Sequence, residues 1–122
     1  MVDDDGAISC YYKNLIMRQS PQDPVLTRFR AAVTDLYGDR VERLVLYGSR
    51  ARGDHRSDSD YDVALFLRDM PNRAEEMSRL AEVETDIPYD TGALINALPF
   101  PAGAYSERTG FMEELRRDGL DL

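Results

Sequence analysis

The stretch from residue 48 to residue 62 carries the side chains best suited to chemistry in this chain. Asp60 and Asp62 stand two positions apart at the expected start of a strand, so their side chains should point to the same face of a sheet. Two carboxylates held that close repel each other unless a cation lies between them. Mg²⁺, which takes oxygen ligands, is the natural cation, so the pair predicts a catalytic metal site. Simple strand-entry polarity is the alternative interpretation.

A phosphate-binding turn is expected directly upstream of this pair. Gly48 lets the backbone turn sharply and approach a ligand closely, while Ser49 offers a hydroxyl and an amide to phosphate oxygens. Arg50 and Arg52 would add positive charge for a polyphosphate, although both could also be ordinary solvated arginines. A phosphate-binding turn beside a metal site is the combination that nucleotide chemistry requires.

Metal-assisted phosphoryl chemistry generally gains from a third carboxylate on a neighbouring strand, which binds metal or takes the proton of the nucleophile. Asp90 is the preferred candidate, because it opens the third expected strand, where Gly92 on the same face leaves space beside it. Asp86 is the alternative, but it precedes Pro88 and is expected in a loop. The preference for Asp90 depends on strand placement alone.

The elements that position these residues follow from apolar periodicity and from capping and breaking residues. Tyr47 and Tyr61 would flank the site and either stack on a base or pack in the core, and three apolar residues of the last helix are expected in the core. In chain order we expect a helix 24–37 capped by Asp23, strands 41–47 and 61–67 joined by a polar loop or helical turn, a helix from Asn72 to Pro88, a strand 89–95, a Pro-rich connection 96–103, and a helix that contains Phe111, Met112 and Leu115 and stops near Gly119.

These elements predict an α/β (α+β) fold, a small mixed β-sheet flanked by helices, in one domain over residues 23–122. Residues 1–22 show no sustained period and are interpreted as a weakly determined leader. The pattern contains no internal repeat and no domain linker.

Composition excludes several classes of protein. The chain has 122 residues, 43% of them apolar, and a formal net charge of −8, so direct nucleic-acid binding is not expected. Cys10 is the single cysteine, which permits no intramolecular disulfide and suggests a reducing compartment. The acidic start and the lack of an apolar run of ~18 residues argue against a signal peptide or a membrane span. We therefore expect a soluble, cytoplasmic protein.

The residues just described resemble a known signature. A Gly-Ser pair, ten residues and Asp-x-Asp, present here from Gly48-Ser49 to Asp60-x-Asp62, are similar to the motif of the DNA polymerase beta nucleotidyltransferase superfamily. The internal Arg52-Gly53 and Ser57-Asp58 also resemble the minimal nucleotidyltransferase branch, and the likeness extends over about residues 25–120. The chain looks most like the minimal nucleotidyltransferase antitoxins that are paired with HEPN toxins.

This resemblance implies the nucleotidyltransferase fold and a two-ion Mg²⁺ site on Asp60, Asp62 and Asp90. It implies that Gly48 and Ser49 hold the phosphates of ATP. The implied reaction transfers AMP to a tyrosine hydroxyl of a HEPN ribonuclease toxin and releases pyrophosphate. Because larger relatives carry an added domain that grips the acceptor, a chain this short would need a partner protein to present it. The alternatives are transfer to a small hydroxylated molecule such as an aminoglycoside, and a non-catalytic antitoxin that acts by binding alone.

Overall fold

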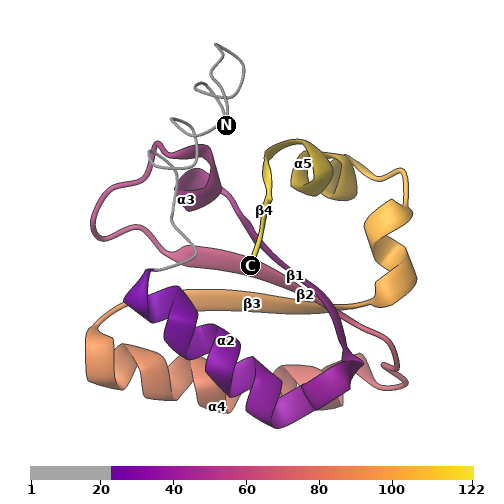
Figure 1. Ribbon diagram of the computed structural model, residues 1–122, viewed down its shortest axis with the longest axis horizontal. Helices are drawn as coiled ribbons and strands as arrows, with labels where there is room; N and C mark the ends of the chain where they lie inside the picture. The colour runs from indigo at the N-terminus through magenta and orange to yellow at the C-terminus, as the bar shows by residue number, and fades with distance from the viewer. Residues whose placement is uncertain (1–22) are drawn as a thin grey trace, which may run out of the picture.

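The computed structural model describes residues 23–122, without the side chains of Tyr89 and Asp90, and places them in a four-stranded mixed sheet with helices on both faces (Figure 1). The strand order is β3-β2-β1-β4. β1 (Val41–Tyr47) runs antiparallel to β2 (Tyr61–Leu67) and to β4 (Leu120–Asp121), while β2 and β3 (Ile95–Pro101) are parallel. The expected α/β architecture is confirmed. The expected leader over residues 1–22 lies outside the described residues.

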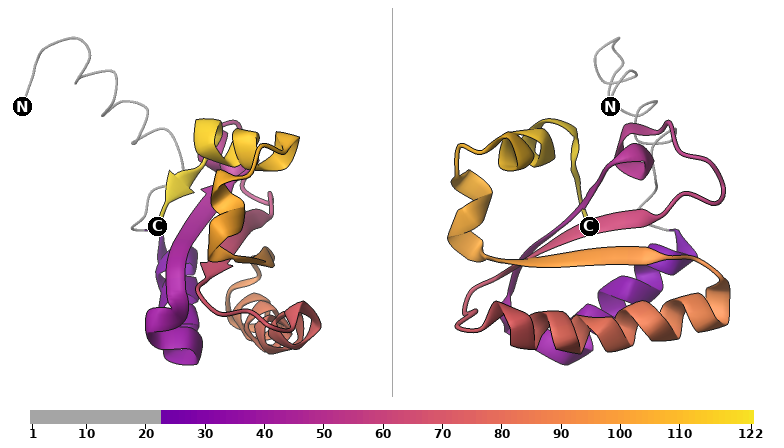
Figure 2. Two further views of the ribbon diagram at one scale, coloured as in Figure 1. Left: turned by 90° about the vertical axis from the view of Figure 1, so that its right-hand side faces the viewer. Right: turned by 180° about the vertical axis from the view of Figure 1, so that it is seen from behind.

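Two helices cover one face of the sheet, α2 (Pro24–Tyr37) and α4 (Arg73–Thr91), and Figure 2 shows them together below the strands. Phe29 of α2 and Leu80 of α4 are fully buried in the core of this face. The first helix begins as the sequence predicts, because the Asp23 carboxylate accepts hydrogen bonds from the first turn and a proline occupies the first helical position. Within residues 23–122, no helix has both the length and the apolar character of a membrane span.

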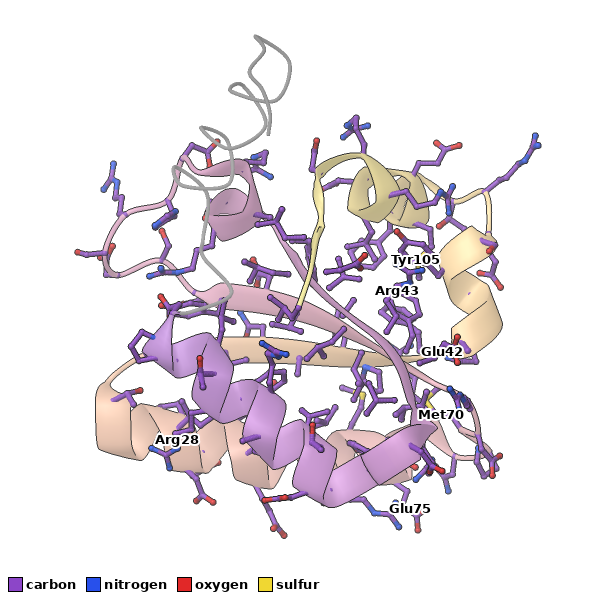
Figure 3. All side chains as sticks on the ribbon, in the orientation of Figure 1. Arg28, Glu42, Arg43, Met70, Glu75 and Tyr105 are labelled. Carbon is purple, nitrogen blue, oxygen red and sulfur yellow. The ribbon has the colours of Figure 1, made fainter. Side chains whose placement is uncertain are left out.

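The opposite face is covered by the 3₁₀ helix η2 (Ala102–Ser106) and by α5 (Gly110–Asp118). Met112 and Leu115 of α5 are buried, as expected, whereas Phe111 is only half-buried. At the far end of this face the guanidinium of Arg43 lies 4.1 Å from the ring centre of Tyr105 (Figure 3). Since both faces are covered, β2 is buried along almost its whole length. The exceptions lie where the strand begins, with Asp62 half-buried in β2 and Asp60 exposed just before it.

The expected strand over residues 89–95 is wrong, because α4 continues to Thr91 and β3 begins only at Ile95. Pro88 does not end the helix. It lies in the last turn, where it removes one backbone hydrogen bond, and its neighbour Ile87 is buried in the core. The helix ends at Gly92 instead, in the left-handed conformation with φ of 79°.

The expected Pro-rich connection over residues 96–103 is wrong as well, since residues 95–101 form the edge strand β3. The N–H of Ala97 points away from β2 and donates to Glu84 Oε2 of α4 at 2.7 Å. Peptide groups alternate along a strand, so the nitrogens of Pro99 and Pro101 lie on the same outer edge, where a missing N–H costs no ladder hydrogen bond. The prolines are therefore compatible with an edge strand, and they leave fewer N–H groups on its outer side for pairing with another strand.

A buried ion pair joins α4 to the 3₁₀ helix η1 (Gly38–Arg40). The side chain of Glu76 is 2% exposed, and its carboxylate accepts hydrogen bonds from Arg40 at 3.0 Å and from Arg79 at 3.3 Å. Burial by itself would raise the pKa of Glu76. The hydrogen bonds with Arg40 and Tyr37, and then the charges of Arg40 and Arg79, outweigh burial and hold that pKa below its ordinary value. Glu76 is therefore ionised in the folded protein.

We expect Glu76→Gln to lower the free energy of unfolding by about 1–3 kcal/mol at pH 7, because it removes a buried charge from two arginines. Because the folded pKa is lowered, the stabilisation is present above the unfolded pKa of about 4.3 and is lost as the pH falls through the folded value. Urea unfolding at pH 7 and below pH 4 measures both effects. Glu75→Gln is the matched control, since this exposed neighbour should cost less than about 0.5 kcal/mol. Equal losses in the two variants would contradict the assignment.

Candidate active site

Asp60 and Asp62 converge where the loop after α3 (Ser49–Arg52) enters β2. One nitrogen, Asn96 Nδ2, donates to Asp60 Oδ2 at 3.0 Å and to Asp62 Oδ1 at 3.2 Å. The two carboxylates therefore reach the same point in space, as their spacing on one face of the strand predicts.

The glycine turn lies against the same pair. Gly48 follows β1 with φ of 76° and ψ of −156°, a conformation essentially restricted to glycine. A Cβ atom at this position would lie 2.7 Å from Asp62 Oδ2, so only glycine lets the backbone approach the carboxylate so closely. Ser49 follows as the first residue of α3. The turn and the carboxylate pair thus form one site.

The electrostatics of the pair favour a cation. Burial raises the pKa of Asp62, the hydrogen bond from Asn96 lowers it, the charge of Asp60 raises it and the charge of Arg52 lowers it, and the net shift is upward. Ionised Asp62 is therefore held at a cost in free energy that a divalent cation between the carboxylates would remove. Hard oxygen donors that converge on one point fit Mg²⁺. Among the described side chains of residues 23–122, which exclude those of Tyr89 and Asp90, no group of three or more His, Cys, Asp or Glu is placed to hold a metal.

The strand placement expected for Asp90 is wrong. Its backbone lies in the last turn of α4, and its side chain lies outside the described residues. Asp86 lies in the same helix and is exposed, so the reason for preferring Asp90 over it does not hold. The position opposite Asp62 on the parallel neighbour β3 is Asn96. Sequence reasoning missed this residue because it began the third strand six positions too early.

Arg50, for which the sequence predicts a phosphate contact, binds the loop that leads to the carboxylates in this structure. It is 6% exposed and donates from Nε to the carbonyl of Ser59 at 3.0 Å and from Nη2 to the carbonyls of Ser57 at 3.2 Å and Arg56 at 3.4 Å. Its guanidinium also lies 3.8 Å from the ring centre of Tyr61. Through these contacts Arg50 holds the loop that ends at Asp60. The sequence of the loop did not predict that Arg50 would bind it.

Arg52 remains at the edge of the site. Its side chain is 42% exposed and pairs with Asp54 at 3.3 Å, yet its charge still lowers the pKa of Asp62. The two flanking tyrosines differ. Tyr61 is buried, its hydroxyl donates to Asp23 at 3.0 Å, and burial followed by this hydrogen bond raises its pKa to about 12, so it packs in the core. Tyr47 is half-buried and meets Phe111 edge to face on the side of the carboxylates.

Comparisons with known proteins agree with this fold. The family described as Nucleotidyltransferase domain matches residues 26–116. A relative from Methanocaldococcus jannaschii, named as a putative protein adenylyltransferase, is 24% identical over 98 residues, which are 80% of this chain and 95% of the relative.

Two solved structures share the fold at 15% identity. The first is a toxin–antitoxin crystal structure with AMP-PNP, with a TM-score of 0.58 over 78% of this chain and 69% of that one. The second is a putative nucleotidyltransferase from Sulfolobus solfataricus, with a TM-score of 0.53 over 99% of this chain and 89% of that one.

We expect Gly48→Ala to destabilise the protein by about 2–3 kcal/mol, and Gly92→Ala by about 1 kcal/mol, in urea unfolding. Both glycines have positive φ, but only at Gly48 would the new Cβ meet a neighbour, whereas at Gly92 nothing lies within 4 Å. The extra loss should shrink when Gly48→Ala is made in an Asp62→Ala background, which removes the contacted carboxylate. An extra loss that stays the same in that background would show that the contact is not responsible.

Proposed function

The chain belongs to the nucleotidyltransferase domain family, and on this premise we propose that it is an antitoxin that transfers AMP from ATP to a tyrosine hydroxyl of a HEPN ribonuclease toxin. The observation that carries the proposal is the convergence of Asp60, Asp62 and the Gly48 turn on one point at the entry of β2. The relative named as a protein adenylyltransferase supports a protein as acceptor. The toxin–antitoxin structure with AMP-PNP supports a toxin partner and an adenine nucleotide.

The proposed reaction assigns a separate task to each part of the site. Gly48 and Ser49 bind the phosphate oxygens, and exposed Arg52 adds positive charge beside them. Asp60 and Asp62 hold Mg²⁺, which when bound neutralises negative charge on the phosphates. The acceptor oxygen forms a bond to the α-phosphorus, the bond from that phosphorus to the bridging oxygen breaks, and pyrophosphate leaves with its electron pair. The hydroxyl proton of the acceptor passes to solvent water.

A phenol suits this site better than an aliphatic hydroxyl. The residue opposite Asp62 on the neighbouring strand is Asn96, whose amide cannot act as a base near neutral pH. A tyrosine hydroxyl ionises near pH 10, so it loses its proton with less assistance than the hydroxyl of serine or of a sugar. This chemistry favours a tyrosine acceptor over an aminoglycoside. The net charge of −8 further favours a partner with a basic surface.

The test is incubation of the purified protein with α-labelled ATP, Mg²⁺ and the purified product of the adjacent reading frame, which the proposal expects to be a HEPN protein. We expect label on a tyrosine of that partner, identified by mass spectrometry, and no label when the divalent cation is chelated with EDTA. Label on an added aminoglycoside would instead support the small-molecule alternative. Stable binding of the partner without label would support an antitoxin that acts by contact alone.

We expect Asp60→Asn and Asp62→Asn each to reduce the rate of label transfer by about 10²-fold or more, because each removes a charged metal ligand. Binding of the partner, measured by calorimetry, should stay within about threefold of wild type. Asp58→Asn is the matched control, since it neutralises an exposed carboxylate two residues before the pair and should keep its transfer rate. Transfer that survives both site substitutions would refute the assignment of these carboxylates.

A further inference from the structure

We propose that Asn96 is the third residue of the cation site, as a neutral ligand whose amide bridges the carboxylates when the cation is absent and presents its oxygen when the cation binds. The inference rests on the metal-dependent function proposed above and adds a residue to that site. It predicts a site built from two carboxylates and one amide.

The contacts of Asn96 place its amide where a positive charge is needed. A single nitrogen donates to both carboxylates, one from the loop and one from β2, at 3.0 and 3.2 Å. The two N–H groups carry partial positive charge, so they reduce the repulsion between Asp60 and Asp62 in the way that a cation would, but less strongly. The amide thus stabilises the pair in the protein without metal.

The position of Asn96 is fixed by the sheet. β3 is parallel to β2, and the register pairs Asn96 with Asp62. Its neighbours Ile95 and Ala97 are 4% and 5% exposed in the core beneath α2 and α4, so alternation along the strand directs Asn96 to the opposite face, where the carboxylates lie. The residue therefore faces the site because of its backbone and not because of a chance rotamer.

The same side chain can serve both states without movement of the backbone. A half-turn about the terminal torsion of asparagine exchanges Nδ2 and Oδ1 at nearly the same place, and this torsion is soft. The carbonyl oxygen of an asparagine is an ordinary ligand of hard divalent cations. Two carboxylates and one amide then carry a charge of −2, which one divalent cation balances. An aspartate at this position would bring the charge to −3.

The experiment titrates the purified protein with Mn²⁺, without nucleotide or partner, by calorimetry and by the Mn²⁺ signal in electron paramagnetic resonance. Asn96→Asp should bind Mn²⁺ about tenfold more tightly than wild type, and Asn96→Leu about tenfold more weakly. In EDTA, both variants should unfold at lower temperature than wild type, and Mn²⁺ should restore Asn96→Asp. Ser57→Asp is the control, because it adds the same charge to the exposed loop and should change the affinity less than threefold.

Wild-type affinity for Mn²⁺ in Asn96→Leu, or no tightening in Asn96→Asp, overturns this inference. A folded Asn96→Asp with tighter binding supports it even if Asn96→Leu does not fold. The titration contains no acceptor, so it is independent of the transfer reaction. If the Asn96 variants change the Mn²⁺ affinity as expected but the wild type transfers no label, only the proposed reaction is refuted. If the wild type transfers label but the variants leave the Mn²⁺ affinity unchanged, only the role of Asn96 is refuted.

Discussion

Repulsion between two carboxylates at the entry of one strand is the constraint on which this end of the molecule depends. Asp60 and Asp62 lie within hydrogen-bond distance of a single nitrogen, and Asp62 leaves no room for a Cβ atom at Gly48. Like charges so close cost free energy without a compensating positive charge. In the described structure, the amide of Asn96 and the charge of Arg52 supply part of this compensation. A bound cation would compensate the rest of the repulsion between the two carboxylates.

The scaffold holds the pair in spite of this cost. β2 is buried on both faces and pairs with a strand on each side, so its register cannot shift to separate the carboxylates. Arg50 binds three carbonyls of the preceding loop and lies against the ring of Tyr61. The hydroxyl of Tyr61 in turn donates to Asp23 at the start of α2. The loop, the strand and the first helix are therefore fixed together behind the site.

The third position of the site shows how strand pairing decides chemistry. The parallel register of β2 and β3 places Asn96 beside Asp62, although the two residues are 34 positions apart in the sequence. In the proposed site, an amide at this position would bind the cation without adding negative charge and without acting as a base. A hydroxyl acceptor that loses its proton readily then fits the site better than one that needs a strong base.

The sequence alone was sufficient for features that depend on local interactions. The Asp23 cap, the bounds of β1 and β2, and the spacing from Gly48 to Asp62 follow from side chains within a few residues of one another, and the structure has these elements as predicted. Only the tertiary structure decided the rest. Pro88 continues a helix because Ile87 is buried beside it, and Pro99 occupies a strand because its position faces an open edge. Arg50 and Asn96 have their roles through residues that folding brings to them, and no local pattern encodes which distant partner a side chain will meet.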